Sequence, residues 1–144
     1  MYTIEIGQLE QMVQIEQAIP EFSSPKKLAD IKLRLADKRH LLLIAYHNSE
    51  PIGYKLGYAL NDTTFYSWLG AVVPNHRGQG LAQKMLLQQE SWLQQHGFTA
   101  VQVKTMNRFR AMLAMLVKNN YAIIDLEKAP SFQDHKIRFE KLLG

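Results

Sequence analysis

Residues 72–82 carry the residue types and the spacing of an anion-binding loop. The segment reads Val-Val-Pro-Asn-His-Arg-Gly-Gln-Gly-Leu-Ala, which predicts an apolar strand, a proline stop, a glycine-rich turn and the start of a helix. Gly78 and Gly80 place no Cβ atom between the backbone and a bulky anion. The free N–H groups of the helix's first turn and the positive end of its dipole attract such an anion, and Arg77 adds a charged fork at the rim. The segment therefore predicts a phosphate or pyrophosphate site.

Two well-known phosphate loops do not fit this segment. A Walker loop needs a Lys-Ser or Lys-Thr pair after its last glycine, whereas Gly80 is followed by Leu81 and Ala82. The dinucleotide fingerprint needs Gly or Ala at position 83 and an acidic residue about 20 residues further on. Position 83 is Gln, and residues 98–102 contain no acid.

The loop resembles the acyl-CoA loop of the GNAT family of N-acetyltransferases, whose pattern is [RQ]-x-x-G-x-[GA]. Arg77 to Ala82 match this pattern, with an apolar strand before them and an expected helix from Leu81 to His96 after them. A second motif of that family, N-x-x-A-x-x-L-Y followed by K-x-G-F, is matched at Asn107, Lys118 and Tyr121. The resemblance covers Ile52–Leu126 well and the two ends of the chain by topology.

The sequence departs from the family pattern at two positions. Asn120 stands where the family prefers glycine, and Asn is the next-best residue for a left-handed helix cap. The family's helical tyrosine, which often protonates the departing CoA thiolate, falls at about Leu116 with Met115 beside it. Neither side chain can donate a proton, so that acid is in doubt here.

Periodicity and turn residues predict an α+β (α/β) fold in the order β-α-α-β-β-β-α-β-α-β-β. The resemblance implies a GNAT-like mixed, mostly antiparallel sheet flanked by helices. The expected helices cover 9–18, 25–36, 81–96 and a segment between Asn107 and Lys118, with Ser23-Ser24-Pro25 as the start of the second helix. The expected strands are 2–6, 41–46, 52–60, 65–73, 100–104, 122–126 and 135–142.

By the resemblance, acetyl-CoA is the co-substrate, and its pyrophosphate binds the backbone N–H groups of residues 77–82. These are Arg77, Gly78, Gln79, Gly80, Leu81 and Ala82. The backbone edge of Val72 and Val73 pairs with the pantetheine amides, and an N–H group near Val72 serves as oxyanion donor. Asn107 either caps the following helix, contacts the cofactor, or does both.

The group that accepts the amine's proton cannot be assigned from the sequence, because no acidic residue lies between Asp62 and Glu90. The catalytic candidates are Glu21, Tyr66, Asn107 and Tyr121, and each also has an ordinary structural explanation. Further candidates for a base, some acting through water, are Asp62, Asp125, His135, His76, Tyr54 and Tyr58. A water chain without a single essential base is the remaining possibility, since positioning alone can accelerate acyl transfer.

Aromatic residues on the strands before the loop predict one wall of an acceptor pocket. Strand alternation places Tyr66 and Trp68 on one face and Phe65, Ser67 and Leu69 on the other. With Tyr54 and Tyr58 they would suit a cationic or apolar acceptor, and core packing explains the same residues equally well. These aromatic residues therefore do not identify the substrate.

Composition limits the class of protein. The chain has 144 residues, 47% hydrophobic and 21% charged, which is typical of one globular domain covering 1–144. It contains no cysteine, which excludes disulfides and thiolate chemistry, and no metal site is expected. The longest apolar run, 41–46, is too short for a membrane span, and the N-terminus lacks signal-peptide features, so we expect a cytoplasmic protein. The net charge of +4 fits a solvated basic helix or an anionic ligand better than nucleic-acid binding.

These observations together predict an acetyl-CoA-dependent N-acetyltransferase. The resemblance implies direct attack by a primary amine of a small-molecule or peptide acceptor, with a homodimer as one possible assembly. The alternative is a catalytically weak CoA-binding sensor or assembly protein of the same fold. The residues do not specify the acceptor, the acyl-chain length or the oligomeric state.

Overall fold

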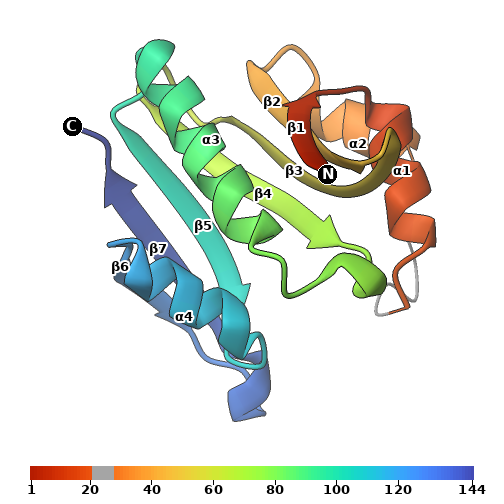
Figure 1. Ribbon diagram of the computed structural model, residues 1–144. Helices are drawn as coiled ribbons and strands as arrows, with labels where there is room; N and C mark the ends of the chain where they lie inside the picture. The colour runs from red at the N-terminus through yellow and green to blue at the C-terminus, as the bar shows by residue number, and fades with distance from the viewer. Residues whose placement is uncertain (21–27) are drawn as a thin grey trace.

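The structure, a computed structural model, describes residues 1–20 and 28–144, whose strands form one seven-stranded sheet flanked by helices (Figure 1). The strands are β1 (Tyr2–Ile6), β2 (His40–His47), β3 (Glu50–Ala59), β4 (Thr64–Val72), β5 (Ala100–Met106), β6 (Ala122–Glu127) and β7 (Lys136–Leu142). The α-helices are α1 (Leu9–Gln17), α2 (Leu28–Leu35), α3 (Leu81–Gln95) and α4 (Arg110–Lys118). Short 3₁₀ turns, η1 (Pro74–His76) and η2 (Phe132–Asp134), precede α3 and β7.

The sheet has the strand order β1-β2-β3-β4-β5-β7-β6, and only the β4–β5 pair is parallel. The predicted element order and the mixed, mostly antiparallel sheet are confirmed. Turn chemistry explains the boundaries: Asn48 and Ser49, with φ of 50° and 75°, form a two-residue hairpin between β2 and β3. Gly97 and Asn120, with φ of 85° and 71°, follow the ends of α3 and α4 as expected. The predicted start of the second helix at Ser23-Ser24-Pro25 lies outside the described residues.

Helices cover both faces of the sheet, α1 and α2 on one face and α3 and α4 on the other (Figure 1). Strand β2 shows why, because Leu42 and Ile44 join the core under α1 and α2 while Leu41 and Leu43 join the core under α3 and α4. A strand that is apolar on both faces is stable only when both are covered. The central strands are therefore buried, and their few polar side chains stand out.

A β-bulge interrupts the pairing of β3 with β4. Leu56 pairs with Leu69 and Gly57 with Ser67, so Trp68 is the extra residue on β4. The bulge reverses the alternation of side chains, and Leu69 packs with Trp68 against the core under α1 and α2. The expectation that Leu69 shares a face with Ser67 is therefore wrong, because strict alternation does not hold across a bulge.

Strands β4 and β5 separate toward their C-terminal ends (Figure 1). Their parallel pairing covers only Thr64–Ser67 opposite Ala100–Val103, although β4 continues to Val72 and β5 to Met106. Beyond this point β4 keeps β3 as its only partner, so one backbone edge of β4 is free of strand pairing in the described part of the chain. The sheet thereby opens at the end where the predicted anion loop begins.

We expect Gly57→Ala to destabilise the fold, because the added Cβ would lie 2.4 Å from Phe65 Cε2 and 2.6 Å from the Tyr66 carbonyl oxygen. Overpacking of this kind costs about 1–3 kcal/mol, measured as the free energy of unfolding in urea. Gly70→Ala on the neighbouring strand is the control, since its Cβ would have no neighbour closer than 3.4 Å. Equal unfolding free energies for the two variants would contradict this account of the bulge.

Candidate functional site

A cavity of about 440 Å³ lies where β4 and β5 separate. Its walls come from β3 and β4, from the loop that joins β4 to α3, and from the facing turns of α3 and α4. The lining residues are Tyr54, Lys55, Gly70, Ala71, Val72, His76, Arg77, Gly78, Gly80, Leu81, Ala82, Gln83, Met85, Ala111, Met112 and Met115. The cavity therefore joins the opened sheet to the glycine-rich loop.

The glycine-rich loop has the backbone geometry of an anion cradle. Gly78 and Gly80 have φ of 78° and 77°, and a Cβ added to either would meet no atom within 4 Å, so the space beside the loop is open. Gly80 is the N-cap of α3, which has no side-chain cap and no acidic residue in its first turn. The first N–H groups of an α-helix have no partner within the helix, so they remain available to a ligand here.

The free edge of β4 offers other residues to a ligand than the Val72 and Val73 pair that the sequence suggested. The Val73 N–H donates to the Ile52 carbonyl at 2.9 Å, and Val73 does not line the cavity. The Val72 carbonyl faces the other way and accepts from Arg77 Nε at 2.9 Å. Because alternate residues of a strand point their backbone groups to the same side, Gly70 shares the free edge with Val72. Gln79, although part of the predicted loop, is also not a lining residue.

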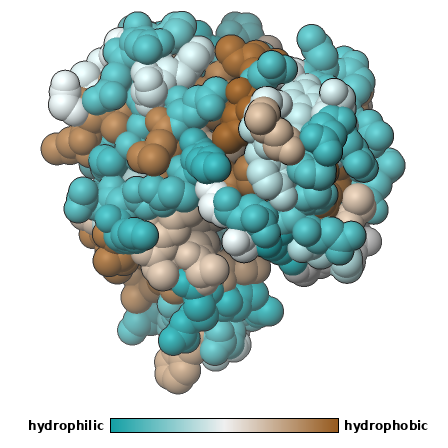
Figure 2. Space-filling view, in the orientation of Figure 1, coloured by the Kyte–Doolittle hydropathy of each residue, from teal (hydrophilic) through white to brown (hydrophobic). Residues whose placement is uncertain are grey.

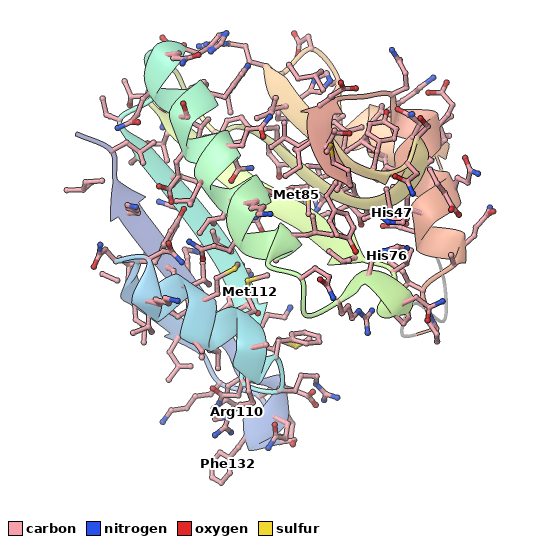
Figure 3. All side chains as sticks on the ribbon, viewed as in Figure 1. His47, His76, Met85, Arg110, Met112 and Phe132 are labelled. Atoms are coloured by element: carbon pink, nitrogen blue, oxygen red, sulfur yellow. The ribbon has the colours of Figure 1, made fainter. Side chains whose placement is uncertain are left out.

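Methionines of α4 form the wall opposite the sheet. Met112 and Met115 line the cavity with Ala111, whereas Leu116 is fully buried in the core. Figure 2 shows a weakly hydrophobic surface over α4, and in Figure 3 Met112 lies between α4 and α3. The helix therefore presents soft apolar side chains where the related family often has a tyrosine, and no proton donor comes from Leu116.

A side-chain pair ties α4 to α3 beside the cavity. Gln83 Nε2 donates to Asn119 Oδ1 at 2.8 Å, and Asn119 Nδ2 donates to Gln83 Oε1 at 2.7 Å. Asn119 Nδ2 also donates to the Met115 carbonyl at 2.8 Å. This pair fixes the spacing of the helices that enclose the ligand space.

His76, a candidate base, lines the cavity and is partly exposed. Its Nδ1 is 3.0 Å from the Tyr2 hydroxyl, and its ring centre is 4.8 Å from that of His47 (Figure 3). Strand β1 therefore holds the imidazole beside the loop.

Lys55 on β3 is the charged residue of this site that the sequence analysis missed, besides the uncharged lining residues Gly70, Gln83, Met85 and Met112. Its side chain is 7% exposed, and a Cβ placed on Gly70 would lie 3.9 Å from Lys55 Cγ. Burial lowers the pKa of the Lys55 amine to about 8, and the nearby Glu90 carboxylate opposes that shift. A lysine within an apolar strand buried on both faces is the sequence signal that could have revealed it.

The carboxylate nearest Lys55 is already engaged by other groups. Glu90 on α3 accepts a hydrogen bond from the Tyr121 hydroxyl at 2.7 Å and pairs with Lys141 Nζ at 2.8 Å. Tyr121 is buried in the core, and burial together with Glu90 raises the pKa of its hydroxyl. Tyr121 does not line the cavity, so its position supports the packing interpretation given to it at first.

Asn107 does not cap the helix that follows it. The N-cap of α4 is Phe109, while Asn107 Nδ2 donates to the Phe132 carbonyl at 2.8 Å and so fixes the η2 turn. The N-cap expectation is wrong because the chain makes one more turn before α4 begins. Asn107 also does not line the cavity.

The proposed carboxylate bases and His135 lie away from the cavity or outside the described residues. Glu21 is among the residues that the structure does not describe. Asp62 and Asp125 are exposed, and His135 Nε2 lies 3.0 Å from the Ala129 carbonyl oxygen. The described lining of the cavity contains no carboxylate.

The aromatic residues predicted to line an acceptor pocket form a cluster, but Tyr58, Tyr66 and Trp68 do not line the cavity, and the protein's own cations cover part of the cluster. The Tyr58 ring makes edge contacts with Tyr66 and Trp68, both with ring centres 5.6 Å away. The Arg34 guanidinium lies 5.0 Å from the Trp68 ring centre, and Lys38 Nζ lies 5.6 Å from that of Tyr58. Burial is the main cause that raises the pKa of the Tyr66 hydroxyl, and Tyr66 is not a lining residue.

Tyr54 belongs to a buried pair that was not foreseen. Its hydroxyl donates to Glu16 of α1 at 2.5 Å, and Glu16 is 2% exposed. Burial is the main cause that raises the pKa of the Tyr54 hydroxyl, and the hydrogen bond to Glu16 adds to it. This pair joins α1 to β3 on the face away from Lys55.

Residues 1–20 and 28–144 contain neither a metal-binding cluster nor a membrane-spanning helix. No group of three or more His, Cys, Asp or Glu side chains there could hold a metal ion. None of the helices in these ranges has the length and hydrophobicity needed to cross a membrane.

Comparison with known proteins shows which family shares this sequence. The model of the acetyltransferase (GNAT) family matches residues 9–121. The chain belongs to the GNAT family of acetyltransferases. The match includes β4, the glycine-rich loop, α3 and α4 of this GNAT domain. A comparison with curated protein sequences gives no match.

Solved structures share the fold of this GNAT protein at low sequence identity. The ribosomal-protein-S18-alanine N-acetyltransferase from Escherichia coli is 16% identical, with a TM-score of 0.85, over 99% of this chain and 94% of that one. A GNAT acetyltransferase from Elizabethkingia anophelis with acetyl-CoA bound is 20% identical, with a TM-score of 0.77, over 99% and 98%. A putative acetyltransferase from Salmonella typhimurium with acetyl-CoA is 12% identical, with a TM-score of 0.80, over 99% and 94%. At these identities the likeness shows the fold.

We expect Lys55→Met to raise the free energy of unfolding, because it removes a buried cation whose nearest carboxylate is already paired with Lys141. In the native wild type the lysine loses its proton at about pH 8, whereas in the unfolded chain it does so near pH 10.4. The unfolded state therefore binds more protons over this interval, and the wild type gains stability as the pH rises.

The gain in free energy of unfolding of Lys55→Met over the wild type should accordingly be greatest below pH 8. It should shrink by about 3 kcal/mol up to pH 10.5. The measurement is denaturant unfolding of both proteins at several pH values. Lys136→Met, the same substitution at an exposed position on β7, is the control and should show no such trend. A difference for Lys55→Met that stays constant across the interval would contradict the placement of a buried ammonium group.

Proposed function

We propose that this GNAT protein is an N-acetyltransferase that transfers an acetyl group from acetyl-CoA to a primary amine of a small molecule or peptide. The observation that carries the proposal is the cavity between β4 and β5, which ends at the glycine-rich loop. Acetyl-CoA supplies an activated acyl group as a thioester. The related structures from Elizabethkingia anophelis and Salmonella typhimurium hold acetyl-CoA, which supports the same co-substrate here.

The residues of the cavity fit the parts of this co-substrate. The open backbone at Gly78 and Gly80 and the uncapped start of α3 suit a pyrophosphate group. The free edge of β4 at Gly70 and Val72 suits the pantetheine amides, which would extend the sheet as an added strand. Met85, Met112 and Met115 offer apolar contact to the rest of the pantetheine arm.

Direct attack by the amine is the proposed chemistry, because the sequence has no cysteine and the described lining has no carboxylate to serve as a nucleophile. A backbone N–H on the free edge of β4 would donate to the developing oxyanion. The amine must lose one proton before it attacks, because only a neutral nitrogen is nucleophilic. Water is proposed to take the second proton, which the nitrogen releases after it has bonded to the carbonyl carbon. The E. coli relative acts on an alanine of a ribosomal protein, so a peptide amine is one acceptor class to test.

The alternative is a GNAT protein that binds CoA but transfers acetyl groups slowly, as a sensor or assembly partner. Leu116 in the core and the absence of a carboxylate in the described lining favour it. Turnover separates this alternative from the proposed enzyme.

Acetyl-CoA titrated into the purified protein should bind, and CoA should then be released only when an amine is present. Calorimetry measures the binding, and a thiol assay with a panel of peptide and small-molecule amines measures the release. Binding without release across a broad panel favours the sensor, whereas lack of binding to both acetyl-CoA and CoA refutes the proposal.

Gly80→Val should abolish measurable CoA binding by calorimetry, because the new side chain would occupy the open space beside the uncapped start of α3. Gly97→Val is the matched control, since Gly97 also has a positive φ, 85° against 77°, and open space around it, but lies at the far end of α3. Both variants carry similar backbone strain, of about 1–2 kcal/mol. Unchanged affinity in Gly80→Val, or equal loss in both variants, would contradict the loop assignment.

A further inference from the structure

Lys55 is a buried cation without a direct partner in the described part of the chain. Glu90, the carboxylate that influences it, is bonded to Lys141 and Tyr121 and forms no ion pair with Lys55 among these residues. Lys55 and Lys141 carry two positive charges and Glu90 carries one negative charge, so one positive charge beside the cavity is not balanced. A buried charge is unfavourable unless something compensates it, so this arrangement suits a group that becomes negative in the cavity.

The position of Lys55 relative to β4 indicates which group in the cavity becomes negative. Lys55 pairs with Gly70 in the strand register, and the Lys55 stem lies beside the space that a Gly70 side chain would fill. Gly70 belongs to the free edge, on the sheet side of the cavity, whereas the anion loop lies beyond the end of β4. If pyrophosphate occupies the loop and the pantetheine arm follows the edge toward Gly70, the reactive end reaches Lys55.

The opposite wall supplies no alternative proton donor. Met112 and Met115 face the cavity from α4, and Leu116 is fully buried. Tyr121 is held by Glu90 in the core and does not line the cavity. Of the described lining residues, His76 and Arg77 lie at the loop, beyond the end of β4, whereas Lys55 lies on β3 opposite Gly70.

We propose that Lys55 is a catalytic residue of the acetyl transfer, whose ammonium group donates a proton to the sulfur atom of the departing coenzyme. This inference rests on the proposed function. It replaces the tyrosine acid that is missing from α4 with a cation from β3.

The proton balance of the step is complete with water as the only other participant. The amine nitrogen bonds to the carbonyl carbon, the carbon–sulfur bond breaks, and the sulfur keeps the electron pair of that bond. Lys55 gives one proton to the sulfur and regains one from solvent, while the attacking nitrogen loses one to solvent. Because the pKa of Lys55 is lowered to about 8 and that of a thiol is about 8.5, the transfer is nearly balanced in energy.

The direct test is the ionisation of bound CoA, followed by the ultraviolet absorbance of its thiolate during a pH titration. With the wild-type protein, the pKa of the bound thiol should lie about one unit or more below its value in Lys55→Met, because the cation favours the thiolate. Lys136→Met is the matched control and should keep the wild-type value. An unchanged thiol pKa in Lys55→Met would overturn the proposal.

Kinetics and mass analysis of the same proteins complete the test. Lys55→Met should lower kcat about 10²-fold and leave KM for acetyl-CoA nearly unchanged, as expected for loss of a general acid. Lys55→Arg should keep the thiolate shift but not recover kcat, because a guanidinium does not give up its proton readily. Acetylation of Lys55 itself in the wild type without an amine, seen by mass spectrometry, would make it a nucleophile and overturn the proposal.

The outcomes distinguish failure of this inference from failure of the proposed function. Wild-type protein that binds CoA and turns over, with equal thiol pKa values in wild type and Lys55→Met, refutes only the role of Lys55. Wild-type protein that does not bind CoA refutes both. A thermal unfolding scan of Lys55→Met confirms that the variant is folded, as its predicted gain in stability requires.

Discussion

The end of hydrogen bonding between β4 and β5 after Ser67 and Val103 is the constraint on which the rest of the site depends. Unpaired backbone groups in a protein need partners, so a sheet that opens in its middle must fill the gap with other groups. The bulge at Trp68 and the close contact of Gly57 with Phe65 redirect β4 at this point. The strand edge, the loop and the start of α3 consequently face one cavity, each with donors or acceptors that the fold leaves free.

The electrostatics of the cavity follow from the same opening. Arg77, His76 and the N-terminus of α3 lie at the loop, and Lys55 lies deeper, beside Gly70. The described lining has no carboxylate, and Glu90, which influences Lys55, is engaged by Lys141 and Tyr121. One end of the cavity thus suits a bound anion and the other suits a negative charge that forms during reaction.

The opposite face of the sheet carries the aromatic residues that the sequence suggested as a wall of an acceptor pocket. Its aromatic cluster of Tyr58, Tyr66 and Trp68 is partly covered by Arg34 and Lys38. The solved structures that share the fold at 12–20% identity do not identify the acceptor of this chain.

The sequence by itself determined the order of the elements, the anion loop and the caps at Gly97 and Asn120, because periodicity and turn chemistry act over a few residues. The tertiary structure decided what depends on strand register and on contacts between distant segments. It placed Leu69 on the other face through the bulge, gave the Val73 N–H to Ile52, moved the start of α4 past Asn107, and buried Lys55 in the cavity. Apart from the lysine within an apolar strand, these features have no local pattern, since each arises only when two separate parts of the chain meet.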